Sequence, residues 1–141
     1  MLTQDYLVRL LMDFAAGIMR SMQRAADHHD PQGAAEMLEA AVGESVDMDG
    51  ATLLSLSPDS IATIMQVSGV DPAVTEHIAR SLMLASSYYD EAGSSALSQL
   101  RSAQAQAIAS AYGFDISDMV QGDQLESAEL AMRAFLEDQD S

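Results

Sequence analysis

The stretch from Asp71 to Tyr112 constrains the fold most, because helix start and stop signals divide it into two parts. Asp71-Pro72 predicts a helix start, since the aspartate carboxylate can accept the free N–H groups of the first turn and proline there loses no hydrogen bond. Gly93 and Gly113 predict the ends of two successive helices. A connection as short as the one at Gly93 makes the helices antiparallel. The sequence therefore predicts a helical hairpin at the packing centre of the chain.

Both halves of this hairpin carry apolar residues at helical spacing. The stripe in the first half consists of Val74, Ile78, Leu82, Ala85 and Tyr89. The expected facing stripe in the second half consists of Leu97, Leu100, Ala103, Ala107, Ile108 and Ala111. We expect these two stripes to contact each other.

Similar signals divide the rest of the chain. Further helices are predicted over residues 3–28, 30–46, 57–69 and 124–137, and residues 51–56 are expected to form a buried turn or extended connector. No β-branched run alternates with a period of two, so no strand is predicted. We expect one all-α domain over residues 1–141, a bundle of five to six helices with antiparallel hairpins whose residues 137–141 are frayed.

Composition and motifs exclude several kinds of chemistry. The chain has no cysteine, which excludes disulfides, thiolate metal sites and a cysteine nucleophile. The segment Asp47-Met48-Asp49-Gly50 lacks the end ligands of a calcium loop, because Ser45 and Leu56 occupy those positions. His28-His29-Asp30 has no evident third metal ligand, and no phosphate loop, serine elbow or HExxH motif occurs. We therefore predict no cofactor, no metal, no catalytic residue and no enzymatic activity.

The net charge of −16 limits the classes of partner. Nucleic acids and anionic membranes both need a basic surface, so neither is an expected partner, whereas a basic protein is compatible with this charge. The apolar stretch from Tyr6 to Met22 is interrupted by Arg9, Asp13 and Arg20 and has no basic region before it. Such a stretch resembles neither a signal peptide nor a membrane span, and we expect a cytoplasmic protein.

The first helix carries an unusually wide apolar surface. Its main stripe is Leu7, Leu11, Phe14, Ile18 and Met22, and Val8, Met12, Ala15 and Met19 widen it. A helix of this kind is either central in a bundle or half of an interface. We predict a homodimer that forms through this helix.

Two tyrosines are candidate contacts with a protein partner. Tyr88 and Tyr89 are adjacent in a predicted helix, so one can be buried while the other is exposed. We expect Tyr88 to be the exposed one, since Tyr89 belongs to the apolar stripe.

Arg20, Arg24 and His28 form a stripe at i, i+4 and i+8 along the first helix. This stripe predicts a small anion site. The favoured alternative is that these cations pair with Glu36 and Glu39 on the antiparallel second helix.

Two resemblances add to these expectations. Leu84, Ala85 and Tyr88 resemble the first helix of a tetratricopeptide hairpin, although Ser81, Leu97 and Ala109 occupy positions where that signature has tryptophan, a small residue and proline. The opening Gln4-Asp5-Tyr6-Leu7-Val8-Arg9 resembles the start of an uncharacterised family of small, helical bacterial proteins. The resemblances imply helical, tetratricopeptide-like packing and no particular activity.

The leading hypothesis is a non-enzymatic protein–protein interaction or scaffold module. The alternative is a small-molecule-binding or enzymatic domain that uses a cleft between helices. A third hypothesis, mimicry of nucleic acid, requires acidic side chains in rows.

Overall fold

The computed structural model describes residues 2–46 and 48–115, with side chains from Leu7 onward. This part of the chain contains six helices and no strand: α1 (Leu2–Asp27), α2 (Pro31–Val46), α3 (Gly50–Leu54), α4 (Pro58–Val67), α5 (Pro72–Glu91) and α6 (Ser95–Tyr112). The expected all-α bundle of five to six helices is confirmed. The helix predicted over residues 124–137 lies outside the described residues.

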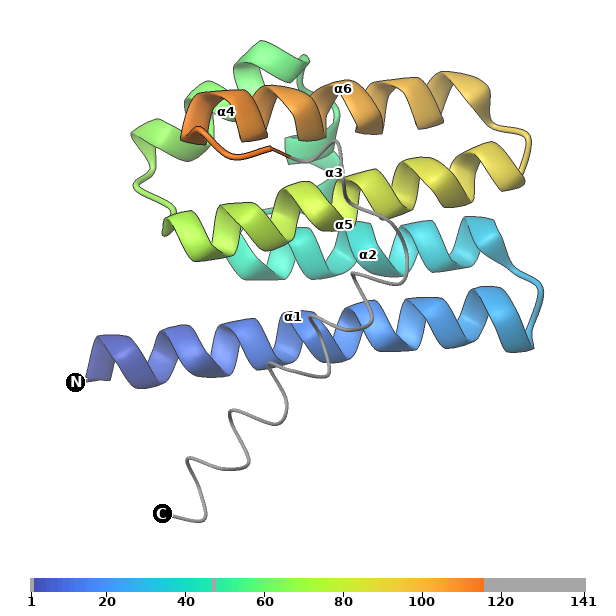
Figure 1. Ribbon diagram of the computed structural model, residues 1–141, viewed down its shortest axis with the longest axis horizontal. Coiled ribbons are helices and arrows are strands. Elements are labelled where there is room, and N and C mark those ends of the chain that lie inside the picture. Colours follow the sequence, from blue (N-terminus) through green and yellow to red (C-terminus); the bar gives the residue numbers. More distant parts are fainter. Residues whose placement is uncertain (1, 47, 116–141) are drawn as a thin grey trace.

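The four long helices run side by side with their axes roughly parallel (Figure 1). Two antiparallel hairpins, α1–α2 and α5–α6, make up this arrangement, and α5 lies between α2 and α6. The short helix α3 contacts α2, and α4 contacts α6. Helix α1 packs mainly against α2 and lies at the edge of the bundle, so it is not the central helix.

The helix boundaries follow the signals in the sequence. The Asp71 carboxylate accepts a hydrogen bond from the Ala73 N–H at 2.8 Å and caps α5. Gly69, Gly93 and Gly113 have φ angles of +70°, +82° and +76° at the ends of α4, α5 and α6, a conformation that favours glycine. These predictions are confirmed.

One local prediction is wrong. Residues 51–56 were expected to form a turn or extended connector, but most of them belong to α3, because Asp49 caps this short helix by accepting from the Thr52 N–H at 3.3 Å. Ser94 is the N-cap residue of α6, although its side chain makes no capping hydrogen bond.

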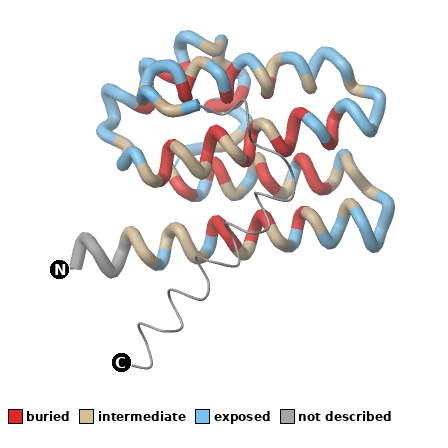
Figure 2. Tube along the Cα trace, viewed as in Figure 1, coloured by how far each residue is buried: buried red, intermediate tan, exposed pale blue. Residues whose placement is uncertain are grey.

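The buried core follows the inner faces of the long helices (Figure 2). All five residues of the predicted α5 stripe are at most 4% exposed, which confirms that stripe. The predicted stripe on α6 is wrong: Leu97, Ala103 and Ala111 are exposed. Of that stripe, Ile108 is fully buried as predicted. The other buried residues of α6 are Arg101, Gln104, Ala105 and Ala109.

Ser81 is a polar side chain in the centre of this core. Its hydroxyl is fully buried and has no hydrogen-bond partner within the described part of the chain. Since an unsatisfied buried hydroxyl is unfavourable, we expect Ser81→Ala to raise the free energy of unfolding by about 1 kcal/mol in a urea titration. Ser86→Ala is the matched control, because the Ser86 hydroxyl donates to the Ser98 carbonyl at 2.7 Å. A loss of stability in both variants would contradict this interpretation.

Candidate functional site

Two polar side chains of α6 are buried because they bind the end of α3. The Arg101 Nη1 group donates to the Leu54 carbonyl at 2.9 Å, and the Gln104 amide donates to the carbonyls of Leu54 at 3.0 Å and Leu56 at 2.9 Å. The last carbonyls of a helix have no partner within it and need donors from elsewhere. The polar face of α6 supplies these donors, and this requirement explains why the predicted stripe on α6 is wrong.

Arg101 also forms a buried ion pair between α6 and α2, and Tyr89 of α5 binds to the same carboxylate. Its Nε donates to Glu39 Oε2 at 2.6 Å, and the two side chains are 8% and 17% exposed. The Tyr89 hydroxyl donates to both oxygens of the same carboxylate, at 3.0 and 2.9 Å. Burial and the nearby Glu39 carboxylate raise the pKa of Tyr89, so the phenol stays protonated and remains a donor. Glu39 of α2, Tyr89 of α5 and Arg101 of α6 therefore form a polar cluster whose charges are paired.

Two residues of this cluster, Glu39 and Arg101, also line a cleft of about 940 Å³ between α2, α3 and α6. We call it the α2–α3–α6 cleft. Its apolar lining residues are Met48, Leu54, Leu97 and Leu100, its small ones are Ala40, Gly43, Gly50, Ala51 and Ser55, and its charged ones are Glu36, Glu39, Glu44, Asp49 and Arg101. Large apolar side chains are exposed at three described positions, and two of them, Met48 at 38% and Leu97 at 39%, line this cleft.

The predicted tyrosine contact is not at the surface. Tyr88 was expected to be exposed, but it is only 3% exposed, and Tyr89 is 4% exposed. Helix α5 has neighbours on several sides, with α1, α2 and α6 all packed against it, so both tyrosines contact other helices. The exposure predicted for Tyr88 is therefore wrong, and neither tyrosine lines the α2–α3–α6 cleft.

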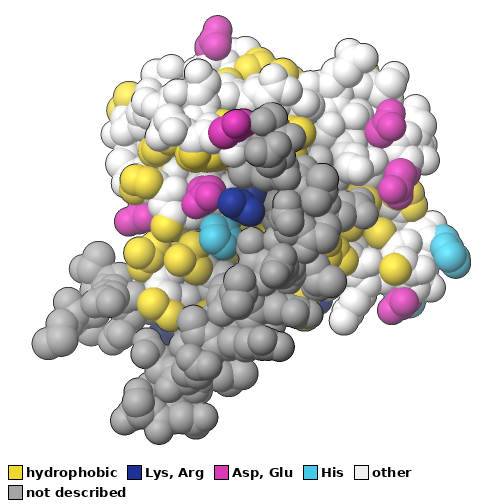
Figure 3. Space-filling view, in the orientation of Figure 1, with side chains coloured by type: hydrophobic (Ala, Val, Ile, Leu, Met, Phe, Trp, Pro, Cys, Tyr) yellow, Lys and Arg dark blue, Asp and Glu magenta, His cyan; other side chains and the backbone are white. Residues whose placement is uncertain are grey.

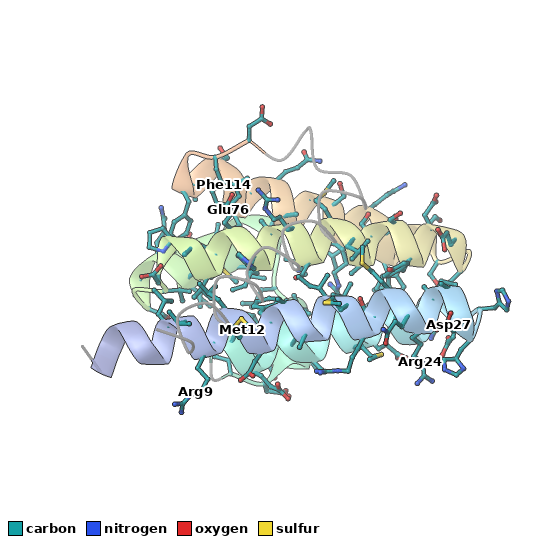
Figure 4. All side chains as sticks on the ribbon, turned by 60° about the horizontal axis from the view of Figure 1, so that its bottom comes forward. Arg9, Met12, Arg24, Asp27, Glu76 and Phe114 are labelled. Carbon is teal, nitrogen blue, oxygen red and sulfur yellow. The ribbon has the colours of Figure 1, made fainter. Side chains whose placement is uncertain are left out.

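The basic stripe of α1 is exposed at the end of that helix. Arg20, Arg24 and His28 are all exposed, and Arg24 Nε contacts Asp30 Oδ2 at 3.0 Å (Figure 4 shows Arg24 near the end of α1). A hydrogen bond from the Gly33 N–H and the Arg24 guanidinium lower the pKa of Asp30. The expected pairing with Glu39 is wrong, because Glu39 contacts Arg101. An anion-binding role for the stripe stays a prediction.

His77 is a half-buried titratable group on α5. Its ring lies 6.0 Å from the ring of Phe14 in α1, measured between centroids, and its Nδ1 is 3.1 Å from the Ala73 carbonyl oxygen. The adjacent Glu76 binds Arg80 at 2.9 Å (Figure 4 labels Glu76). Burial lowers the pKa of His77 below its ordinary value of 6.5.

This lowered pKa predicts a loss of stability in mild acid. The unfolded chain binds a proton at His77 more readily than the folded chain does. The contribution of neutral His77 to folding stability is therefore fully present above pH 6.5 and is lost as the pH falls through the lower folded-state pKa. We expect the melting temperature to fall between about pH 7 and pH 5, and His77→Gln to reduce this fall. His28→Gln is the control, since His28 is exposed. If the melting temperatures of the two variants depend equally on pH, the loss of stability does not come from His77.

The described residues lack the features of several other kinds of site. They contain no group of three or more histidine or acidic side chains that could hold a metal ion. None of the helices described is long and apolar enough to cross a membrane. On the face shown in Figure 3, acidic side chains stand apart from one another, unlike the rows that nucleic-acid mimicry requires.

Comparison of the chain with protein-family models, with curated proteins and with solved structures finds no match. Within the described residues, the α2–α3–α6 cleft is where two exposed large apolar side chains, Met48 and Leu97, come together.

Proposed function

We propose that this protein is a non-enzymatic protein-interaction module whose contact surface is the α2–α3–α6 cleft. The observation that carries the proposal is the position of Met48 and Leu97, two exposed large apolar side chains that line the same cleft. Apolar side chains gathered at one place on a surface are typical of sites that bind another protein. Leu100, which is half-buried, extends this apolar lining.

The open lining favours a protein over a small molecule. Eight of the fourteen lining residues are exposed, including Met48, Leu97 and Ala51. A small-molecule site encloses most of its ligand, and its polar groups converge on that ligand. Here the buried polar groups, Glu39 and Arg101, are paired with each other. The alternative is a small-molecule-binding or enzymatic domain that uses this cleft, and the volume of about 940 Å³ supports it.

Photo-crosslinking tests the proposal. Benzoylphenylalanine at position 97 is expected to crosslink a discrete protein in a lysate of the native host. The same group at position 106 is the control, because Gln106 is exposed on the same helix but does not line the cleft. Equal crosslinking from both positions, or none from position 97, would overturn the proposal. A melting shift with a metabolite that Leu97→Asp abolishes would favour the alternative.

Three further expectations belong to this proposal. We propose that the protein acts in the cytoplasm, that α5 and α6 pack in a tetratricopeptide-like manner, and that two copies associate through α1. Three apolar residues of α1, Val8, Met12 and Met19, are half-buried, which supports association through this helix.

Met12→Glu should then shift the molecular mass measured by sedimentation equilibrium from that of a dimer to that of a monomer. A wild-type chain that is already monomeric would exclude the dimer.

A further inference from the structure

Resting on the proposed function, we infer that the occupant of the α2–α3–α6 cleft is an amphipathic α-helix of a partner protein, with lysine or arginine beside its apolar stripe. The shape of the cleft, its apolar positions and its charge each support this class of partner.

The shape of the cleft suits a helix. Helices α2 and α6 both pack on α5 with their axes roughly parallel (Figure 1). Residues of both helices line the cleft. The lining residues of α2 include Glu36, Ala40 and Gly43, which are spaced by about one helical turn. Because Ala40 is exposed and has a minimal side chain, a partner helix can approach α2 closely at this position.

The apolar positions of the cleft suit the anchors of such a helix. Leu97 and Leu100 of α6 lie on one side, and Met48, next to α3, lies on another. An amphipathic helix binds a groove through apolar residues at i, i+3, i+4 and i+7. Methionine at the rim is flexible and adapts to such anchors.

The charge of the cleft selects a basic partner. Four carboxylates and one guanidinium line it, and this guanidinium, from Arg101, is paired with Glu39. Glu36 and Glu44 are exposed and form no salt bridge with any residue between 7 and 115 that the structure describes. A second copy of this chain would bring the same carboxylates against them, so self-association here is disfavoured. Lysine or arginine beside the apolar stripe would pair with these carboxylates.

Three synthetic peptides test this inference. The first is an amphipathic helix of about five turns with a leucine stripe flanked by lysine, the second has glutamate in place of lysine, and the third has the composition of the first in an order without the stripe. Fluorescence anisotropy with the full chain measures binding at about 50 mM and about 300 mM NaCl. The first peptide should bind about tenfold or more tightly than either of the others, and its affinity should fall with salt.

Paired variants locate this binding. Leu97→Asp should weaken binding of the first peptide at least about tenfold, whereas Val67→Asp, at an exposed position outside the cleft, should not change it. Glu44→Gln should weaken binding about threefold, whereas Glu91→Gln, an exposed acid on α5, should leave it unchanged. Circular dichroism melts check that each variant is folded.

The two proposals fail differently. If position 97 crosslinks a host protein but the lysine and glutamate peptides bind equally, or the cleft variants behave like their controls, the basic helix is the wrong partner and the interaction role stands. If position 97 crosslinks nothing, the interaction role itself falls. Mass spectrometry of the crosslinked segment gives an independent readout, because a segment without basic residues would also overturn the inference.

Discussion

Arg101→Met is expected to lower the free energy of unfolding by about 3 kcal/mol, because it leaves Glu39 as a buried carboxylate without its cation. It also removes a donor from the Leu54 carbonyl at the end of α3. The loss lies at the lower end of the range for broken buried ion pairs, since the Tyr89 hydroxyl still donates to Glu39. Urea denaturation followed by circular dichroism measures it.

Arg24→Met is the matched control for this result. Arg24 pairs with Asp30, but their side chains are 50% and 38% exposed, so solvent screens the pair and its loss should cost much less stability than the loss of Arg101. The double variant Glu39→Leu with Arg101→Met should recover part of the stability, because no buried charge is left without a partner. If Arg101→Met costs no more than Arg24→Met, the ion pair contributes little to folding.

Gly43→Ala is expected to lower the free energy of unfolding by about 2 kcal/mol and to displace α3. A Cβ atom at Gly43 would lie 2.8 Å from the Gly50 nitrogen and 3.0 Å from the Met48 carbonyl oxygen. Both contacts are with backbone, which cannot turn aside as a flexible side chain can. The close approach of α2 to the start of α3 therefore requires a glycine here. Chemical denaturation measures the loss.

Gly17→Ala provides the comparison, because Gly17 is also a buried glycine inside a long helix. The nearest atom to its added Cβ is the Ala41 Cβ at 3.4 Å, an ordinary contact, and alanine should raise stability by up to about 1 kcal/mol through helix propensity. Gly43→Ala should also weaken binding of the lysine-flanked peptide, since Gly43 and Met48 both line the cleft. A fully stable Gly43→Ala variant would show that the α2–α3 contact can relax.

Local signals were enough to predict most of the helices. The Asp-Pro start at 71 and the glycines at 69, 93 and 113 act within one turn of the helix that they bound, so their effect can be read from neighbouring residues. The α5 stripe was also predictable, because its five residues recur at helical spacing and all belong to the hydrophobic core.

The α2–α3–α6 cleft and its polar cluster could not be predicted in this way. A stripe chosen by polarity assigns Arg101 and Gln104 to solvent, yet both are buried because they bind α3, whose Leu54 lies 47 residues before Arg101. Leu97 belonged to the predicted inward stripe, and its exposure follows from the different rotation of α6. A stripe through positions 101, 104, 105 and 108 also has helical spacing, and it is the signal that could have indicated this rotation.

Propensity, capping, periodicity and net charge depend on the residues alone, so the sequence was enough to predict the helical class of the fold, most helix boundaries, the α5 core and the strongly acidic charge. Only the tertiary structure decided which face of α6 is buried, that Tyr88 is covered, and that Met48 and Leu97 meet at one cleft. The physical reason is that unpaired carbonyls and buried charges are satisfied by groups far apart in the chain, and the packing of α2, α3, α5 and α6 brings those groups together.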